Sequence, residues 1–161
     1  MNKAKVSARH DGNLSILTVE DARQYSHIEE VTGDLSGYAT FNAPALASVG
    51  GSLYVYADFE TPMLTSVVGN LYVYADFEAP GLASVGGYLE VYADFEAPAL
   101  AYAYGKQGRL IATSSYGLWL ADDGMYYAGC RGPFTRPQAL AHWDRPDDRA
   151  RIFTAAIKAA A

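Results

Sequence analysis

Three nearly identical segments, spaced 18 residues apart, constrain this chain more than any other feature of its sequence. Each reads Leu-x-Val-Tyr-Ala-Asp-Phe-Glu, and they occupy residues 53–60, 71–78 and 89–96. The connecting segments 61–69 and 79–87 also match, through a proline, a leucine, a Ser-Val pair and a glycine corner. A short unit that repeats at a fixed period buries its apolar side by stacking on its neighbours. The repeat therefore predicts a solenoid.

Degenerate copies of the unit precede the three clear ones. One period earlier, Leu35 and Phe41 hold repeat positions. In the copy before that one, Arg23 replaces the phenylalanine, and the matching residues are Leu17, Val19, Ile28 and Val31. We therefore expect about five coils, at residues 17–34, 35–52, 53–70, 71–88 and 89–105. Before them, Asp11-Gly12 lies between alternating residues from Val6 to Val19, a pattern typical of a hairpin. It predicts an N-terminal cap over residues 1–16.

Two periodicities alternate within one coil. Leu53, Val55, Ala57 and Phe59 are spaced by two, which places them on one face of a strand and predicts one strand per coil. The segment after Pro62 has apolar residues three apart and is expected to form a single helical or 3₁₀ turn. The glycines that follow suit the corner into the next strand.

The repeat pattern stops after residue 105, and residues 106–161 are expected to form a C-terminal cap. Short strands are predicted at 109–113, 116–121 and 125–129. The sequence Thr135-x-x-Gln138 is a capping box that opens a helix through Trp143, and a second helix is expected from Asp148 to about residue 160. Trp119 and Trp143 are interpreted as core of this cap. The predicted fold class is mainly β: a parallel β-solenoid of 18-residue repeats with a C-terminal α+β cap.

The pattern Pro-x-Leu-x-Ser-Val-Gly-Gly-x-Leu-x-Val, at residues 44–55 and 80–91, resembles the leucine-rich-repeat superfamily, in particular its short-coil, receptor-L-domain-like variety. The resemblance implies a leucine-rich-repeat-like solenoid and says little about function. The chain departs from it in lacking a regular asparagine ladder, because Asn42 and Asn70 occupy different repeat positions. Residues 128–143 resemble small phage and prophage proteins that join such coils to such a tail. That resemblance implies a phage-encoded protein of the anti-CRISPR or anti-defence type.

The charge of −6 is unevenly distributed, because residues 35–104 hold seven acidic side chains and no Lys or Arg. Stacking places equivalent residues about 4.8 Å apart. The outward-facing aspartates, glutamates and tyrosines of successive coils should therefore form rows on one face. We name the aspartate row, the glutamate row, the tyrosine stack and the second tyrosine row. Their members are Asp58, Asp76 and Asp94; Glu60, Glu78 and Glu96; Tyr38, Tyr56, Tyr74 and Tyr92; and Tyr54 and Tyr72.

Three interpretations of these rows are open. Duplication alone copies solvent-facing charges, and the aspartate could close an Asx-type bend before the phenylalanine. Alternatively, the rows bind a basic protein surface by imitating the phosphates of a nucleic acid, as acidic β-helices of the pentapeptide-repeat kind do by analogy. Calcium shared between stacked aspartates is a third interpretation, although the Gly/Asp-rich loop of calcium-binding solenoids is missing. We expect no cofactor.

Support for catalysis or a metal site is weak. Cys130 is followed by Arg131, which could lower its pKa, and His142 lies 12 residues further on, but no third orienting group is evident. His10 and His27 lack neighbours at ligand spacing. The arginines 145, 149 and 151 alternate with aspartates 144, 147 and 148, which predicts pairing on a helix surface.

The function expected from the sequence is that of a non-enzymatic acidic protein-binding module. Its sharpest form is an inhibitor of a host nucleic-acid-binding defence complex, acting by nucleic-acid mimicry or steric blocking. The alternative is a structural or adhesion module that recognises a surface partner. We expect neither direct nucleic-acid binding nor a membrane span, and leave the oligomeric state open. A single cysteine and the lack of an apolar leader at the N-terminus favour the cytoplasm of a bacterial host.

Overall fold

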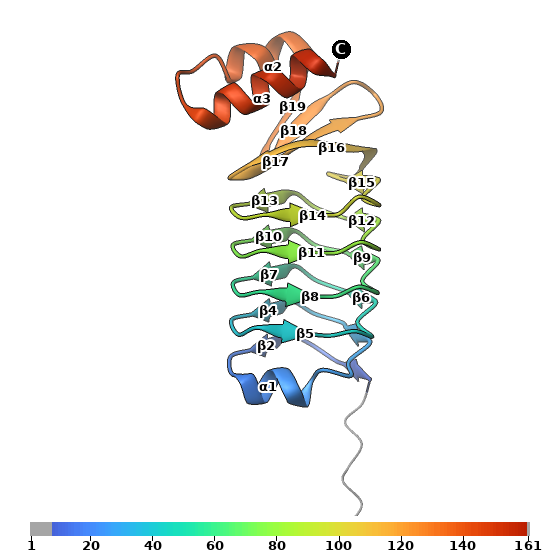
Figure 1. Ribbon diagram of the computed structural model, residues 1–161. Coiled ribbons are helices and arrows are strands. Elements are labelled where there is room, and N and C mark those ends of the chain that lie inside the picture. Colours follow the sequence, from blue (N-terminus) through green and yellow to red (C-terminus); the bar gives the residue numbers. More distant parts are fainter. Residues whose placement is uncertain (1–7, 161) are drawn as a thin grey trace, which may run out of the picture.

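The computed structural model describes residues 8–160 and shows a parallel β-solenoid that ends in a cap of antiparallel strands and two helices (Figure 1). Equivalent residues pair directly between coils. Leu53 pairs with Leu71, and Leu71 pairs with Leu89. The predicted fold class and the 18-residue period are confirmed.

Each complete coil carries three short strands, one in each of three sheets, so the expectation of one strand per coil is wrong. In the coil of β7 (Leu53–Val55), the chain bends at residues 56 and 57 and enters β8 (Phe59–Glu60) on a second side. It turns again where the Leu64 amide donates to the Thr61 carbonyl at 3.2 Å, and then forms β9 (Ser66–Val67). The predicted single turn after Pro62 is present, and it leads into a third strand.

The three sheets run along the solenoid. The strands of the first sheet are β1 (Arg9–His10), β3 (Glu30–Val31), β6 (Ser48–Val49), β9, β12 (Ser84–Val85) and β15 (Tyr102–Ala103). The second sheet holds β2 (Leu14–Ile16), β4 (Leu35–Gly37), β7, β10 (Leu71–Val73) and β13 (Leu89–Val91). The third sheet holds β5 (Phe41–Asn42), β8, β11 (Phe77–Glu78) and β14 (Phe95–Glu96).

Apolar columns fill the space between the sheets. The phenylalanines of the third sheet stack along the axis, with ring centroids 5.1 to 5.8 Å apart. Leucines of the second sheet and valines of the first are completely or almost completely buried beside them. One polar residue interrupts the columns, because Thr61 occupies the place that Ala43 and Ala79 hold in neighbouring coils, and its buried hydroxyl has no partner among the described residues.

A row of polar side chains joins successive coils at the corner between the first and second sheets. The Asp34 carboxylate accepts from the Ser52 amide at 2.7 Å, the Ser52 hydroxyl accepts from the Asn70 amide, and Asn70 Oδ1 accepts from the Tyr88 amide. Asn13 begins the row by accepting from the Asp34 amide. We call Asn13, Asp34, Ser52 and Asn70 the corner ladder. It performs the role of an asparagine ladder with three residue types.

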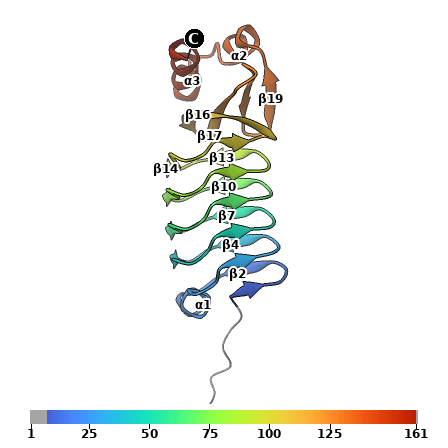
Figure 2. The same ribbon diagram turned by 90° about the vertical axis from the view of Figure 1, so that its right-hand side faces the viewer.

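The N-terminal segment belongs to the solenoid, and the predicted hairpin is wrong. β1 and β2 pair in parallel with β3 and β4, whereas a hairpin requires antiparallel pairing. Leu14, and not Leu17, is the equivalent of Leu35, so the first coil is three residues longer than the others. The extra length forms helix α1 (Val19–Gln24), which lies below β5 where another third-sheet strand would begin (Figures 1 and 2). Leu17 and Val19 are therefore exposed, and Val6 lies outside the described residues.

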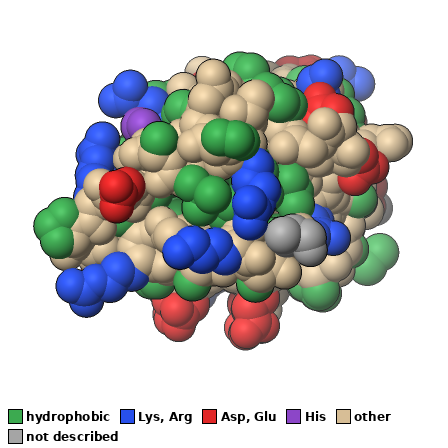
Figure 3. Space-filling model, turned by 90° about the horizontal axis from the view of Figure 1, so that it is seen from above, with side chains coloured by type: hydrophobic (Ala, Val, Ile, Leu, Met, Phe, Trp, Pro, Cys, Tyr) green, Lys and Arg blue, Asp and Glu red, His purple; other side chains and the backbone are tan. Residues whose placement is uncertain are grey.

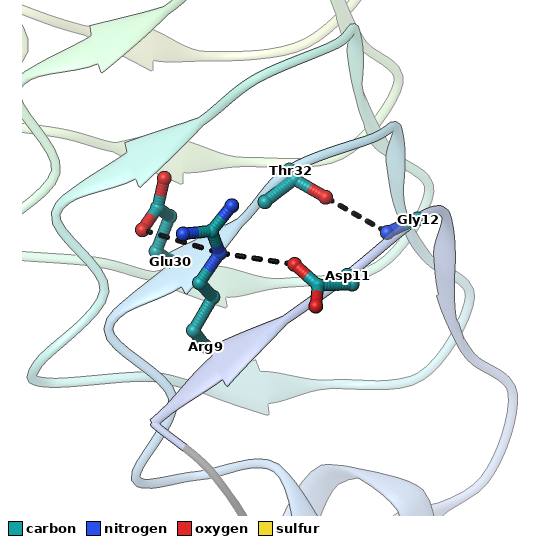
Figure 4. A network of polar contacts seen from close by, with 5 residues as sticks. All are labelled: Arg9, Asp11, Gly12, Glu30 and Thr32. Atoms are coloured by element: carbon teal, nitrogen blue, oxygen red, sulfur yellow. Dashed lines mark hydrogen bonds and ion pairs between the residues drawn. The ribbon is translucent and has the colours of Figure 1, made fainter.

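Polar contacts fix the turn between β1 and β2 to the next coil (Figure 4). The Arg9 guanidinium lies 2.9 Å from Asp11 and 3.9 Å from Glu30, and the Gly12 amide donates to the Thr32 hydroxyl at 2.8 Å. The contacts to Glu30 and Thr32 hold the turn to the coil of β3, which explains why Asp11-Gly12 makes a solenoid corner here.

The cap continues the first sheet with antiparallel strands. β15 pairs with β16 (Lys106–Ser114), which is followed by β17 (Tyr116–Ala121), β18 (Tyr126–Ala128) and β19 (Arg131–Phe134). β17 also covers the last coil, where the Val91 amide donates to the Ser115 carbonyl. The sequence predicted the first three strands and missed β19. That strand contains Gly132-Pro133 and tolerates them because it is the last strand of its sheet.

Two helices complete the cap, α2 (Arg136–His142) and α3 (Asp148–Ala159). The predicted capping box is present, with reciprocal bonds between Thr135 and Gln138. Both helices pack on the far side of the antiparallel strands from the solenoid (Figures 1 and 2), around a second core that includes Trp143 and Phe153. Trp119 instead belongs to the solenoid core, which it closes at this end.

Candidate functional site

The tyrosine stack is the most regular feature of the surface. Its four rings lie nearly parallel, with centroids 4.8 to 5.0 Å apart and interplanar angles of 3 to 7°. Each ring is 40 to 51% exposed. The second tyrosine row lies beside it, with Tyr54 and Tyr72 stacked at 4.6 Å and Tyr54 6.3 Å from Tyr56. The two rows form a continuous aromatic ribbon along the second sheet.

Four tyrosines of the two rows have a pKa above the ordinary value of a tyrosine. Partial burial raises the pKa of Tyr56 and Tyr92, and burial together with the negative charge of Glu90 raises the pKa of Tyr74 to about 12. Burial and the neighbouring Tyr72 raise the pKa of Tyr54. A tyrosine hydroxyl group both donates and accepts hydrogen bonds, and these four residues present such groups along the ribbon.

The carboxylate rows lie around a corner from the aromatic ribbon. The aspartate row follows the bend after the second sheet, and the glutamate row lies on the third sheet. All six side chains are exposed, as the alternation predicted. The expectation of one flat face is wrong, because the chain turns between Tyr56 and Phe59 while its inward-outward alternation continues. The candidate surface is thus a convex edge with tyrosines on one side and glutamates on the other.

The charges of this edge are not neutralised within the solenoid. Among the described residues, no ion pair involves an acidic side chain of residues 35–104. Asp76 Oδ1 accepts a hydrogen bond from the Asp94 amide of the next coil at 3.4 Å. This carboxylate therefore joins two coils, whereas an Asx-type bend would have used it within its own coil. Adjacent carboxylates at the coil spacing repel by about 1 kcal/mol in water.

The tyrosine stack ends against the cap. Tyr92 meets Tyr116 edge-on at 6.3 Å, and the Arg149 guanidinium lies 4.6 Å above the Tyr116 ring centroid, a cation–π contact. The aromatic ribbon, which lies in an acidic region, therefore runs directly into a basic one. Sequence reasoning missed this junction because Tyr116 and Arg149 stand outside the repeats.

The basic region surrounds a cavity of about 200 Å³ between the starts of β17 and β19 and the connection from α2 to α3. We call it the arginine cavity; it is lined by Tyr116, Ala128, Arg131, His142, Trp143, Arg145, Asp147 and Arg149. The predicted surface pairing of the tail holds for Arg151 and Asp148, 3.6 Å apart. It is wrong for Arg145 and Arg149, which face the cavity and make no ion pair among the described residues. Lys and Arg side chains, with histidine beside them, gather over this end of the molecule (Figure 3).

Cys130 and His142, which the sequence supported only weakly as a catalytic pair, line two different hollows. Cys130 is exposed and lines one with Tyr88 and Tyr104, whereas His142 lines the arginine cavity. Burial and the positive charges of Arg145 and Arg131 lower the pKa of His142 below its ordinary value. Within residues 8–160, no group of three His, Cys, Asp or Glu side chains is placed to hold a metal ion. None of the helices in that range has the length and apolar character to cross a bilayer.

Comparisons of the chain with protein-family models, with curated proteins and with solved structures found no match. The fold and the geometry of the surface therefore carry the functional argument.

Proposed function

We propose that the protein is a non-enzymatic binding module whose convex acidic edge docks on a basic protein surface. The observation that carries the proposal is a regular, half-exposed tyrosine stack beside carboxylates that make no ion pair among the described residues. Tyrosines held in one conformation supply contact area at low entropic cost, and unpaired carboxylates attract a cationic partner.

The charge density of the edge supports a sharper form of this proposal. Three successive coils carry two row carboxylates each, which at a coil spacing of about 4.8 Å gives roughly one negative charge per 2.4 Å over that part of the solenoid. Duplex DNA carries one per about 1.7 Å of its axis. A protein groove that binds nucleic acid would therefore encounter a similar density of negative charge on this edge. The sharper proposal is an inhibitor that occupies such a groove in a host defence complex, by mimicry or steric blocking. The resemblance of residues 128–143 to phage proteins supports it.

The exposed aromatic ribbon favours the alternative of a structural or adhesion module. Half-exposed tyrosines in a continuous row offer an apolar contact that needs no charge on the partner. The two functions differ in their response to salt. Binding through the carboxylate rows weakens steeply as ionic strength rises, whereas binding through the ribbon alone does not.

Capture from a bacterial lysate tests the proposal. The baits are the wild-type protein and a neutralised variant with Asp58→Asn, Glu60→Gln, Asp76→Asn and Glu78→Gln, and both columns are eluted with a salt gradient. We expect the wild-type column to retain a basic protein that elutes at moderate salt and is absent from the neutralised column. Retention of the same proteins on both columns, with elution independent of salt, would contradict the proposal and support adhesion.

A further inference from the structure

The side chains that line the arginine cavity carry more positive than negative charge. Three guanidinium groups, of Arg131, Arg145 and Arg149, line it together with a single carboxylate, that of Asp147. Asp147 already caps helix α3, because its Oδ1 accepts from the Ala150 amide at 2.8 Å. The net charge of these four side chains is therefore +2, around one small cavity.

One donor of a residue that lines the cavity lacks an acceptor. The Nε–H of Arg149 is buried, and no acceptor for it lies within the described part of the chain. The same guanidinium is held in place by the Tyr116 ring beneath it. A buried donor without a partner is unfavourable, and an anion in the cavity would supply its acceptor once the Arg149 side chain turns towards the anion.

We propose that the arginine cavity binds a dianionic oxyanion of the phosphate class, either free phosphate or a terminal phosphomonoester. Guanidinium groups match the oxygens of such an anion through paired N–H donors. A dianion balances the two positive charges, whereas a carboxylate would leave one of them. The volume of about 200 Å³ is below the roughly 300–1,000 Å³ of pockets for drug-sized ligands and suits a small ion or the end of a monoester.

The site is separate from the acidic edge and does not depend on the proposed partner. It lies at the cap end of the tyrosine stack, where Tyr92 meets Tyr116. A monoester that carries an aromatic group could place its phosphate among the arginines and its ring towards Tyr116, so the choice of probe distinguishes the two forms of the ligand.

Calorimetric titration of the full chain with inorganic phosphate and, in a second arm, with phenyl phosphate tests this site, with sodium chloride holding the ionic strength constant. Trp143 lines the cavity and supplies a fluorescence signal for the same titration. We expect saturable binding at one site. Arg145→Met and Arg149→Met should each weaken it by about tenfold or more, through loss of a charge-assisted hydrogen bond. Tighter binding of phenyl phosphate identifies a monoester ligand, and equal or weaker binding identifies the free ion.

Arg151→Met is the matched control, since Arg151 lies on the same helix, is 70% exposed in its side chain and pairs with Asp148. This variant should bind as the wild type does. If Arg149→Met fails to fold, Arg145→Met alone decides, because Arg145 is exposed in the connection between helices. The absence of saturable binding to the wild type, or equal weakening by Arg145→Met and Arg151→Met, overturns the proposal.

Discussion

Asn70 Oδ1 accepts a hydrogen bond from the backbone amide of Tyr88 at 3.0 Å, and this contact is one rung of the corner ladder. The Tyr88 amide stands at a corner where no strand offers it an acceptor. The coils are therefore joined there by side chains, and the sequence position just before each of the first four repeat leucines is under a structural constraint. Asn13, Asp34, Ser52 and Asn70 all satisfy it.

Replacing Asn70 tests the ladder. Asn70→Ala leaves the Tyr88 amide without its acceptor in a partly buried corner, so the free energy of unfolding should fall by about 1–3 kcal/mol. The control is Asn42→Ala on the exposed side of β5, whose side chain makes no hydrogen bond among the described residues. It should change stability by less than about 0.5 kcal/mol. Equal effects of the two variants in urea unfolding would show that the ladder contributes nothing.

Thr61 provides a prediction of the opposite sign. Its buried hydroxyl has no partner among the described residues, so Thr61→Val removes an unsatisfied polar group while keeping the shape of the side chain. We expect the free energy of unfolding to rise by about 1 kcal/mol. The matched variant Thr65→Val removes a hydroxyl that donates to the Ala47 carbonyl at 3.1 Å and should give no gain. A loss of stability in Thr61→Val would mean that the hydroxyl is satisfied.

The arginine cavity should bind anions in a pH-dependent manner. The pKa of His142 is lowered by burial and by Arg145 and Arg131, and the cavity also holds Asp147 and Arg149. A bound dianion favours the protonated imidazole and so raises this pKa, which means that binding takes up a proton. Affinity should therefore increase as the pH falls through the pKa of the complex, and level off below the pKa of the free protein.

Sulfate is the probe for this effect, because it keeps its charge between about pH 5 and 8, where histidine titrates. Each unit by which the anion raises the pKa of His142 adds about tenfold to the affinity at low pH. His142→Gln should bind sulfate with little dependence on pH over this range. An unchanged pH profile in that variant would exclude His142 as the source.

The repeat made the architecture predictable, since identical side chains at a fixed period can bury themselves only in register. The break of each coil into separate strands was not predictable from alternation, because the pattern from Leu53 to Phe59 is the same whether the chain runs straight or bends at Tyr56. The sequence did not predict the extra length of the first coil, because the exposed Leu17 lies 18 residues before Leu35 while the buried equivalent is Leu14.

The two candidate sites differ in how far the sequence revealed them. Members of the carboxylate and tyrosine rows are 18 residues apart, so stacking alone places them side by side. The arginine cavity gathers Arg131 from β19, Arg145 from a connection and Arg149 from α3, and only the packing of the cap brings them together. The alternation of arginine and aspartate in the tail suggested surface pairs, because sequence spacing does not tell which side of a short helix faces a cavity.

The central claim is that the exposed carboxylate rows bind a basic partner. The most direct measurement compares the association rate and affinity of the captured partner for three proteins: the wild type, the neutralised variant and a control variant with Glu20→Gln, Glu29→Gln, Asp122→Asn and Asp144→Asn. The control removes the same charge from exposed sites outside the rows. Asn keeps the oxygen with which Asp76 accepts from the Asp94 amide, so the neutralised fold should hold, and relieved repulsion should leave stability equal or slightly higher.

We predict that the neutralised variant loses affinity by about a hundredfold or more, chiefly through slower association, and that the control variant stays within a few-fold of the wild type. A single change, Asp76→Asn, should have only a modest effect because the interaction is shared among equivalent charges. A folded neutralised variant that binds the partner with wild-type affinity and salt dependence would contradict the account.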